Sequence, residues 1–566
     1  MSPLVNEPDE FASEALRGFA ASRGDLVTLL DGGLVRASGV KEGHVAVVLG
    51  GGSGHFPAFA GWLGPGFGSA AAVGNIFASP SENQVLRAAR AAENGGGVIF
   101  VPINYAGDIL HFGAAAERLA ADGVPAKLVA VTDDIASGPI DSELGRRGIA
   151  GSLFVVKVVG AAAERGDELD EVARIAVAAN DATRTLGAAF SGCTLPGAAH
   201  PLFEVPEGRM AVGLGIHGEP GLYDVPSGSA NDVADVLVDG LFDERPPESG
   251  RRVAVVVNGL GATKYDELFV IFGRVRERLE AEGMTIVAPV VGEQVTSLDM
   301  AGVSLSIAYL DEELEELWLA PAFSASFARG AIGQPEPSPS PVKAMQEADA
   351  GEVTPASSEA SATAGRRIAA FLDSAADVID REQQRLGDMD AVAGDGDHGI
   401  GMQRGIRAAQ RAAAAAVEVG GGAATVLRHA GNAWSDVGGG TSGALWGAGL
   451  RAAADVLGDE DEPDAARIRA AVRAFADAVI ARGHANLGDK TMVDAIVPFV
   501  DALEADSGVP IGPAWAAACR TAEAAAQATA ELVAKRGRSH THGDRSRGTP
   551  DPGAVSFALV VAAALG

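Results

Sequence analysis

The stretch GQPEPSPSPVKAMQEADAGEVTPASSEAS, residues 333–361, separates two halves of this 566-residue chain that differ in character. Its density of Pro, Ser, Glu and Ala is typical of an extended linker, because few of its side chains can be buried in a core. A chain of this length exceeds what one hydrophobic core organises. We therefore assign residues 331–363 to a linker and expect separate folding units on its two sides.

The half before the linker, residues 1–330, alternates β-rich runs with Ala-rich helical stretches. The β-rich runs show little polar alternation, which predicts strands that are buried on both faces. Strands are expected at 45–49, 97–101, 126–131, 253–257 and 285–290, and helices at 82–93 and 114–122. This alternation favours an α/β architecture, and the length favours two lobes that divide near residues 190–250.

The half after the linker, residues 364–566, is dominated by Ala-rich segments with helical periodicity. Helices are expected at 366–386, 403–417, 465–482, 513–535 and 555–565. Because no strand pattern of comparable strength accompanies them, the sequence predicts an all-α domain. The expected fold class is therefore multidomain, with a two-lobed α/β half followed by an all-α half.

Composition restricts the partners of the protein. Lys and Arg number 44 against 75 Asp and Glu, a net charge of −31, which disfavours binding to nucleic acid or to an anionic membrane. The two cysteines, Cys193 and Cys519, are too few for a disulfide framework and indicate a reducing compartment. No signal-peptide pattern and no apolar run of about 18 residues is visible, so we expect a cytoplasmic protein without membrane spans.

The segment DAVAGDGDH, residues 390–398, outlines a metal site. Asp390, Asp395 and Asp397 are five and two residues apart, so they cannot share a helix face and a turn must gather them. Clustered carboxylates suit a hard cation, and Mg²⁺ is usually held by a few carboxylates, water and substrate phosphates. The alternative is an acidic Asp-Gly turn between two helices that binds nothing.

A glycine-rich segment in the same half, VGGGTSG at 437–443, can present backbone N–H groups and two hydroxyls to phosphate oxygens. Basic side chains in 488–492 and 535–538 and a rigid turn at 549–553 are further candidates. A flexible connection between helices is the alternative for the glycine run. In combination with the three aspartates, these segments favour a metal–nucleotide site and phosphoryl transfer.

Three titratable residues of the first half stand next to glycines on predicted loops. They are His55 in GGGSGH (50–55), Asp108 in NYAGD (104–108) and His217 in GIHG (215–218). Each alone can be explained as a structural loop residue. Together they are the components of a polar pocket with a general base and a nucleophile. No phosphate-binding motif accompanies them, so we expect this half to bind the phosphate acceptor and the other half the donor.

The order of these motifs resembles that of the dihydroxyacetone kinase family in its fused, single-chain, ATP-dependent form, over nearly the whole chain. In the first half the resemblance rests on GGGSGH (50–55), IFASP (76–80), NYAGD (104–108), RRGIAG (146–151), GIHGEPG (215–221) and TSLDM (296–300). In the second half it rests on GDGDHG (394–399), GDKTM (488–492) and DPGA (551–554).

On the acceptor side, this resemblance implies that a small ketose is bound. His217 would hold the ketone as a covalent hemiaminal, and Asp108 would deprotonate the acceptor hydroxyl. His55 would assist with hydrogen bonding or proton transfer. The residues that line the ketose site would be Gly52, Ser53 and Ser79.

On the donor side, the resemblance implies that Asp390, Asp395 and Asp397 hold two Mg²⁺ ions that bridge the ATP phosphates. The residues beside the nucleotide would be His398, Gly439, Gly440, Thr441, Ser442, Met492, Arg538, Asp551 and Gly553. The helical domain of the family is a barrel of amphipathic helices. The family commonly forms homodimers in which the helical domain of one chain serves the α/β domain of the other, and the linker is long enough for that reach.

Departures from the usual family pattern concern the ketose side. Residues 56–59 replace a segment that usually carries Glu and His, and Asn75 and Ile103 stand where the family usually has Glu and Lys. With VGNIFASP (73–80) and NGLGATKYDELF (258–269), they resemble the branch that phosphorylates erythrulose, which is therefore expected ahead of dihydroxyacetone. The alternatives are FAD cyclisation to FMN and a non-catalytic ketose-binding regulator. The retention of His217 and of the catalytic carboxylates counts against both.

Overall fold

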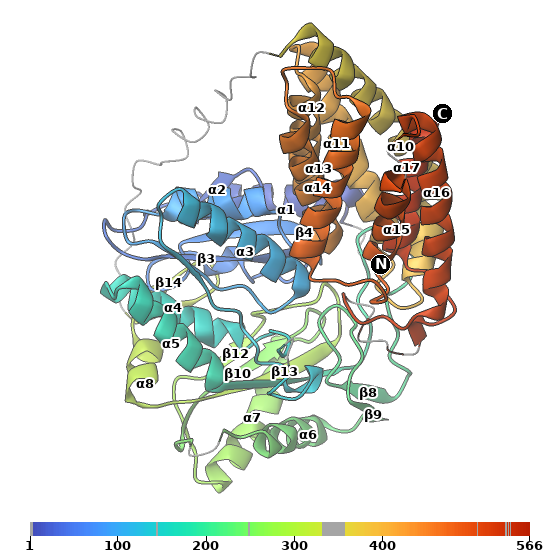
Figure 1. The fold of residues 1–566 in the computed structure, drawn as a ribbon. Coiled ribbons are helices and arrows are strands. Elements are labelled where there is room, and N and C mark those ends of the chain that lie inside the picture. Colours follow the sequence, from blue (N-terminus) through green and yellow to red (C-terminus); the bar gives the residue numbers. More distant parts are fainter. Residues whose placement is uncertain are drawn as a thin grey trace. The chain divides into compact units, whose positions relative to one another are not determined.

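The structure, a computed structural model, describes residues 4–142, 145–246, 249–330, 357–505, 508–537, 540, 543 and 545–565. The chain divides into two compact units, Met1–Pro80 with Gln84–Glu347 and Ser81–Asn83 with Ala348–Gly566. The first is built on β-sheets and the second on helices (Figure 1), which confirms the predicted fold class. Of the predicted linker, residues 331–356 lie outside the described residues, and residues 359–363 belong to a helix.

The first sheet of the α/β unit has the spatial strand order β1-β2-β4-β3-β5-β6. The strands are β1 (Val27–Leu30), β2 (Gly33–Arg36), β3 (Ala46–Ser53), β4 (Ala70–Ile76), β5 (Val98–Phe100) and β6 (Ala126–Leu128). β3 to β6 are parallel, whereas β1 and β2 form an antiparallel hairpin beside β4. The carboxyl ends of the parallel strands therefore lie at one edge, where α/β sheets bind ligands.

The second sheet is mostly antiparallel. In spatial order its strands are β11 (Thr285–Ile286), β10 (Arg252–Gly259), β13 (Gly302–Tyr309), β7 (Thr183–Ala189), β8 (Arg209–Val212) and β9 (Tyr223–Pro226), and β12 (Val290–Gly292) also pairs with β10. Because β7 already belongs to this sheet, the lobes divide before residue 183, and the boundary expected near 190–250 was wrong. The Gly- and Pro-rich residues 190–208 connect β7 to β8 within one sheet. A separate small sheet pairs β14 (Ala322–Phe323) with β15 (Ala328–Arg329).

Helices cover the faces of both sheets (Figure 1). α2 (Glu82–Ala92) and α3 (Ala106–Ala121) pack on one face of the first sheet, and α6 (Ala230–Asp243) and α7 (Tyr265–Ala281) pack on the outer face of the second. The middle layer consists of α4 (Ser152–Arg165) and α5 (Leu169–Asp181), whose core is shared by both sheets. α1 (Phe11–Ser22) and α8 (Glu312–Leu319) join the same core.

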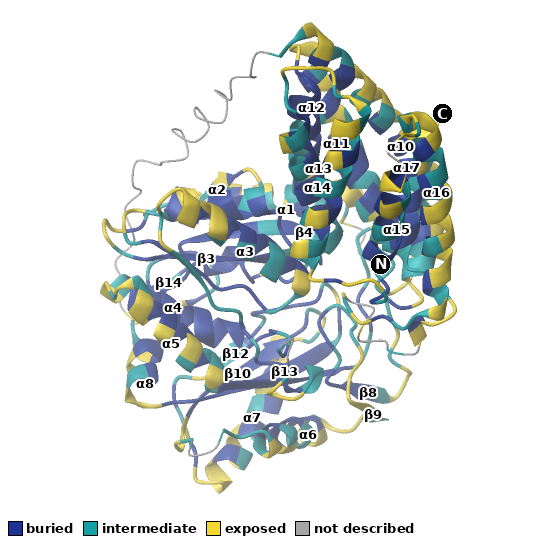
Figure 2. Cartoon of the chain, viewed as in Figure 1, coloured by how far each residue is buried: buried dark blue, intermediate teal, exposed yellow. Residues whose placement is uncertain are grey.

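Helix α4 shows how this middle layer is held together. All residues from Ser152 to Ala163 are buried, as is expected of a helix that is enclosed on every side. Figure 2 shows the same dark colouring of buried residues in the strands of the two sheets. Lys157 is the one charged residue of this run, and its Nζ donates to the carbonyl oxygen of Leu317 at 2.8 Å. Burial lowers the pKa of Lys157 to about 7.

The second unit is a closed ring of helices. They are α10 (Glu359–Asp390), α11 (His398–Glu418), α12 (Ala423–Gly438), α13 (Gly440–Leu457), α14 (Ala465–Gly483), α15 (Val493–Glu504), α16 (Ile511–Ala528) and α17 (Pro552–Ala562). Each helix packs against the next, and α17 packs against α10, so the expected helical barrel is confirmed. Among the helices of the described residues, none combines the length and apolar character that a membrane crossing requires.

Three of these helices were not expected from the sequence. α12 and α13 meet at the single residue Gly439, so the glycine run that suggested a loop is in fact the junction of two helices. α15 contains Pro498 in its interior, and proline is a strong signal against a helix. Their apolar faces nevertheless fill the core of the ring, where Trp434 of α12 stacks on Trp446 of α13 with 4.5 Å between ring centroids. Tertiary packing therefore overrides local propensity here.

Candidate active site

The segment GGGSGH at 50–55 is not a loop after a strand, as the sequence suggested, because β3 continues to Ser53. Its glycines permit close packing within the strand. A Cβ atom on Gly51 would lie 2.4 Å from the ring of Phe59, and one on Gly52 would lie 2.7 Å from the backbone nitrogen of Ala78. The strand therefore passes directly beneath the segment that follows β4.

The residues predicted to line the ketose site lie at the carboxyl ends of neighbouring parallel strands. Gly52 and Ser53 end β3, and the Ser53 hydroxyl donates to the carbonyl oxygen of Gly74 in β4 at 2.7 Å. Ser79 is buried just beyond the end of β4. Asp108 is also buried and occupies the first turn of α3, which follows β5. Asp108 therefore lies on a helix rather than on a strand-end loop.

His55 and His217, predicted from separate motifs, are in direct contact. Their Nε2 atoms are 3.0 Å apart, and their ring centroids are 4.9 Å apart. His55 belongs to the first lobe and His217 follows β8 of the second, so the contact joins the two lobes. The side chain of His217 is only 8% exposed and that of His55 is fully buried. This pair is the centre of the candidate site in the α/β unit.

Hydrogen bonds at the two Nδ1 atoms determine how many protons the pair carries. Nδ1 of His55 lies 2.7 Å from the carbonyl oxygen of Thr296, and Nδ1 of His217 lies 3.0 Å from Oε1 of Glu219. Both oxygens are acceptors only, so both Nδ1 atoms carry a hydrogen. Without a third proton, two lone pairs would face each other across the 3.0 Å between the Nε2 atoms. The pair therefore carries one extra proton and a single positive charge.

The extra proton belongs to His217. Burial and the neighbouring His217 lower the pKa of His55 to about 3, so His55 stays neutral and its Nε2 accepts the hydrogen bond. Burial would raise the pKa of Glu219, but His217 and Arg147 hold it well below its ordinary value. Glu219 is therefore an ionised carboxylate beside the imidazolium of His217.

Two aromatic residues enclose the histidine pair. Phe77 stacks on His55 with 5.0 Å between centroids and places its edge against His217 at 4.9 Å. Tyr105 contacts His217 at 4.8 Å from another side. Phe77 holds a left-handed backbone with φ of 54°, a conformation that costs about 1–2 kcal/mol. Tyr105 is the N-cap of α3, so Asp108 lies one helical turn from a residue that touches His217.

The substitutions that distinguish this chain on the ketose side lie mostly inside the core. Phe59 and Ile103 are buried in the central core of the α/β unit, and the ring of Phe59 packs beneath Gly51. Phe56 is exposed and packs edge-on against Phe19. Phe59 and Ile103 are therefore part of the core that supports the strand ends.

The aspartate cluster of the helical unit is assembled by a turn, as its spacing predicted. Asp390 is the last residue of α10, Asp397 is the N-cap of α11, and Asp395 lies between them. One carboxylate oxygen from each comes within 4.8 Å of the other two. Burial and the Asp390 carboxylate raise the pKa of Asp397 to about 7. Such crowded carboxylates fit a divalent cation, whose charge would offset their repulsion.

The glycine run forms a helix N-terminus rather than a free nest. Gly439 has φ of 59° and ψ of −177° and separates the end of α12 from the start of α13. Gly440, Thr441 and Ser442 are thus the first turn of α13, whose N–H groups point out of the helix end. A Cβ on Gly401 of α11 would lie 3.4 Å from the carbonyl oxygen of Gly438, so the beginnings of α11 and α13 are neighbours.

The remaining predicted nucleotide residues gather at the same end of the ring. Asp551 is the N-cap of α17 and Met492 is the N-cap of α15, and a Cβ on Gly553 would lie 3.4 Å from the Cβ of Met492. A shallow cleft is lined by both Asp390 and Asp551. His398 Nε2 lies 2.9 Å from the Ser556 hydroxyl. Arg538 lies outside the described residues.

The surroundings of Asp551 shift the pKa of its carboxyl group. Burial, together with Asp494 and Asp390, raises the pKa of Asp551 to about 7. The N-termini of α11, α13, α15 and α17 thus meet around carboxylates at one end of the ring. Helix N-termini carry a partial positive charge and bind phosphate groups. This end can therefore bind a metal-complexed polyphosphate without free lysines.

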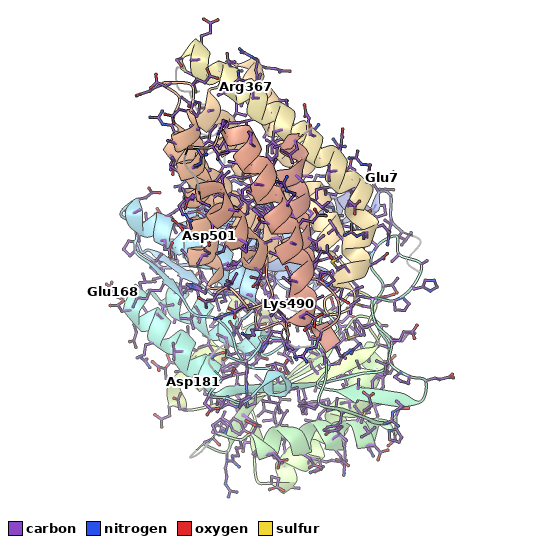
Figure 3. The ribbon with its side chains drawn as sticks, turned by 45° about the vertical axis from the view of Figure 1, so that its right-hand side comes forward. Glu7, Glu168, Asp181, Arg367, Lys490 and Asp501 are labelled. Atoms are coloured by element: carbon purple, nitrogen blue, oxygen red, sulfur yellow. The ribbon has the colours of Figure 1, made fainter. Side chains whose placement is uncertain are left out.

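Lys490, the basic residue of GDKTM, has a structural role instead. Its Nζ donates to the carbonyl oxygens of Thr549 at 2.7 Å and Leu532 at 3.2 Å, and also to that of Ser546. Figure 3 shows Lys490 at the opposite end of the helical unit from Arg367. With three carbonyls bound, the ammonium group secures the turn before α17 and is not directed at a ligand.

Comparison with known protein families divides the chain into the same two parts. Residues 17–326 match the Dak1 domain and residues 392–566 match the DAK2 domain. The chain belongs to the dihydroxyacetone kinase family. The two matches correspond to the unit that holds the histidine pair and to the unit that holds the aspartate cluster.

Full-length relatives place the chain within this family. It is 52% identical to L-erythrulose 1-kinase of Mycolicibacterium smegmatis, over 100% of this chain and 99% of that protein. It is 48% identical to D-erythrulose kinase of the same organism, over 99% and 97% of the two chains. The dihydroxyacetone kinase of C. freundii, solved in complex with AMP-PNP and Mg²⁺, is 28% identical with a TM-score of 0.53 and covers 100% of this chain and 99% of its own.

Several residues that surround the histidine pair were not predicted from the sequence. Phe77, Arg147 and Glu219 all lie inside motifs that carry the resemblance, but the sequence assigned no role to them. Glu219 had a detectable signal, because a carboxylate two residues from a candidate nucleophilic histidine is a natural orienting group. Arg147 had none, since its position beside Glu219 depends on the packing of two distant loops.

Proposed function

We propose that this protein is an ATP-dependent kinase that phosphorylates a terminal hydroxyl of a small ketose, with L-erythrulose as the preferred substrate. The observation that carries the proposal is the His55–His217 pair, in which a nucleophilic nitrogen and a proton carrier face each other at 3.0 Å. The preference for L-erythrulose is supported by the 52% identity to an L-erythrulose 1-kinase. Dihydroxyacetone is expected as a poorer substrate.

When the ketose adds to His217, the extra proton of the histidine pair is the one that the ketone oxygen receives. The Nε2 proton of His217 moves to Nε2 of His55, which leaves a lone pair on His217 to attack the ketone carbon. As the N–C bond forms, the π electrons of the carbonyl move to its oxygen, and His55 delivers the proton there. The products are a hemiaminal hydroxyl and an N-alkylated imidazolium that faces Glu219.

Asp108 is proposed as the base that removes the proton from the acceptor hydroxyl. It is a buried carboxylate in the first turn of α3, whose N-cap Tyr105 contacts His217. A ketose held on His217 would therefore extend past this turn. Gly52, Ser53 and Ser79 would line the same site from the ends of β3 and β4. Polyols such as glycerol lack the carbonyl that His217 requires.

The nucleotide is proposed to bind at the end of the helical ring where the N-termini meet. Asp390, Asp395 and Asp397 would hold Mg²⁺, and we propose two ions because three carboxylates can bridge a pair of cations. Bound there, Mg²⁺ would neutralise charge on the ATP phosphates during transfer. The first turns of α11 and α13 would receive the phosphates, with His398, Thr441 and Ser442 beside them.

A coupled assay of ADP release tests the proposed function. The purified protein with Mg-ATP is assayed against L-erythrulose, D-erythrulose, dihydroxyacetone and glycerol. We expect the highest kcat/KM with L-erythrulose, lower values with the other ketoses and no turnover of glycerol. Absence of ADP release with all three ketoses would show that the protein is not a ketose kinase.

We further propose a homodimer in which the helical unit of one chain serves the α/β unit of the other. Two inactive variants, His217→Ala and Asp395→Asn, can then complement each other after mixing. Random exchange of chains would restore about a quarter of the wild-type activity, because half of the dimers are mixed and each has one intact site. If each active site formed within a single chain, no mixture of the two variants would regain activity. Sedimentation of the unmixed protein establishes the oligomeric state.

A further inference from the structure

Glu219 is bound to His217 by two hydrogen bonds that involve different parts of the histidine. Oε2 of Glu219 accepts the backbone N–H of His217 at 3.0 Å, and Oε1 accepts Nδ1–H of the ring at 3.0 Å. One carboxylate therefore holds both the backbone and the ring of the same residue. The ring cannot turn without breaking a charged hydrogen bond, so its Nε2 stays directed at His55.

The carboxylate of Glu219 is anchored in turn by two further charged residues. Nη1 of Arg147 lies 3.7 Å from Oε2 of Glu219. On its other side Arg147 is held by Asp134, through Nε at 3.0 Å and Nη2 at 2.9 Å. The backbone N–H of Asp134 also donates to the carbonyl oxygen of Arg147 at 3.0 Å. The result is a fixed chain of contacts from Asp134 through Arg147 and Glu219 to His217.

Gly215 makes room for this arrangement. A Cβ at this position would lie 2.0 Å from Oε2 of Glu219 and 2.7 Å from Nη1 of Arg147. The N–H of Gly215 donates to the carbonyl oxygen of Glu219 at 3.0 Å, which folds the GIHGEPG segment back on itself. The glycine is therefore required for the close approach of the two charged side chains, and the turn brings Glu219 to the His217 ring.

The charges of this buried group balance only when the histidine pair is protonated. Asp134 and Glu219 contribute two negative charges and Arg147 one positive charge, and these three side chains are at most 12% exposed. The extra proton of the pair supplies the second positive charge. Within this chain of contacts, the proton of the histidine pair therefore offsets the negative charge that Arg147 leaves uncompensated.

We infer that Glu219, held by Arg147 and Asp134, is a positioning residue for ketose addition that fixes the His217 ring and balances the charge of its imidazolium. The inference rests on the proposed function, since it concerns the adduct at the same site. Before addition Glu219 pairs with the protonated ring. After addition the same carboxylate faces the N-alkylated ring, so the net charge of the buried site and the ring that carries it are the same before and after the step.

The variant Glu219→Gln separates these roles from simple packing. Glutamine has the same shape, but only one of its two terminal atoms accepts a hydrogen bond, whereas Glu219 accepts at both. Its NH₂ group must face either the backbone N–H or the ring Nδ1 of His217. In the second case the ring adopts the other tautomer, with a hydrogen on Nε2 and no lone pair for the ketone.

We expect the Glu219→Gln variant to raise KM for L-erythrulose by about tenfold to a hundredfold, the usual range for a lost charged hydrogen bond, with an unchanged KM for ATP. Dihydroxyacetone labelled with ¹³C at C2 gives a direct readout. With the wild type, the signal of the ketone carbon should be replaced by that of a tetrahedral carbon. The variant should show little of this conversion at the same concentrations.

The pH profile gives a readout that a purely structural role would not change. We compare kcat/KM for the ketose at a series of pH values in the wild type and in the Glu219→Gln variant. Because the variant lacks the carboxylate that faces the His217 ring, its profile should differ in shape from that of the wild type, whereas a loss of packing alone should lower kcat/KM equally at every pH. The other titratable groups near the pair include Tyr105, Asp108, Asp133, Asp134, Arg147 and Cys193.

These neighbours do not produce the same effect. Burial raises the pKa of the Tyr105 hydroxyl and of the Cys193 thiol, so both groups are neutral at neutral pH. Arg147 remains charged. Burial raises the pKa of Asp134 to about 6, but this carboxyl is present in both the wild type and Glu219→Gln, so it does not explain a difference between their profiles. Burial also raises the pKa of Asp133, which accepts two backbone N–H groups at 2.8 Å.

Two further variants complete the experiment. Glu315→Gln removes another carboxylate that is paired with arginine, Arg252, and should leave both KM values and the pH profile unchanged. Asp134→Asn leaves both bonds of Glu219 in place and should change the profile by less, so it serves if Glu219→Gln does not fold. Unchanged ketose KM and pH profile in Glu219→Gln, or an unchanged profile in Asp134→Asn, would refute the inference. Lack of kinase activity in the wild type would instead refute the proposed function.

Discussion

Replacement of His217 by alanine is expected to lower kcat/KM for the ketose by about a thousandfold or more, because the variant lacks the nitrogen that we propose bonds the ketone carbon. The ketose would then be held only by hydrogen bonds, and its hydroxyl would no longer be fixed relative to Asp108. The same variant should bind Mg-ATP as the wild type does, since the aspartate cluster belongs to the other unit. Steady-state kinetics and calorimetric titration with Mg-ATP measure the two effects separately.

The control for this change is His200→Ala. His200 is an exposed histidine of the same unit, and its loss should alter neither the kinetics nor the melting temperature. Labelled dihydroxyacetone should give no tetrahedral carbon signal with His217→Ala and a full signal with His200→Ala. If His217→Ala kept the wild-type KM for the ketose, covalent binding by this residue would be excluded.

Replacement of Asp395 by asparagine is expected to produce the opposite pattern. Asp395 lies in the turn between α10 and α11 and contributes one of three oxygens that come within 4.8 Å of one another. Loss of its charge should weaken binding of Mg-ATP and lower kcat by about a thousandfold, because metal ions contribute several kcal/mol to phosphoryl transfer and each 1.4 kcal/mol is a factor of ten. Formation of the ketose adduct on His217 should be unaffected.

A matched substitution on the same helix separates this effect from a general loss of charge. Asp388 is exposed near the end of α10, where its Oδ1 accepts a hydrogen bond from Gln384 at 2.8 Å. The Asp388→Asn variant should retain wild-type turnover and the wild-type dependence on Mg²⁺ concentration. Asp395→Asn should require much more Mg²⁺ or fail to respond. An unchanged Mg²⁺ dependence in Asp395→Asn would remove the aspartate cluster from the proposed metal site.

Local sequence patterns predicted the buried strands and the turn that gathers the aspartates. Continuous apolar runs identified buried strands such as β3 and β10, because a strand that is covered on both faces needs no polar positions. The spacing of the three aspartates required a turn between helices, and α10 and α11 form it. The order of the motifs along the chain was sufficient to indicate the family.

Non-local features were predicted less well. The boundary between the lobes was misplaced because β7 enters the second sheet through its pairing with β13, a contact between residues more than 100 positions apart. The start of α13 was read as a loop because glycines and hydroxyls disfavour a helix, whereas its packing against α12 and α14 stabilises it. In both cases tertiary contacts outweigh the local preference of the chain.

The sequence by itself determined the two-unit architecture, the carboxylates of the candidate metal site and the two histidines, because these depend on periodicity and on residue types at short spacing. Only the tertiary structure decided that His55 and His217 face each other at 3.0 Å and that Glu219 and Arg147 stand behind them. The physical reason is that the protons of an imidazole are set by the acceptors around it. Glu219 reaches His217 through the turn of its own loop, whereas Thr296 of the second lobe reaches His55 of the first, so the pair is complete only when the two lobes pack together.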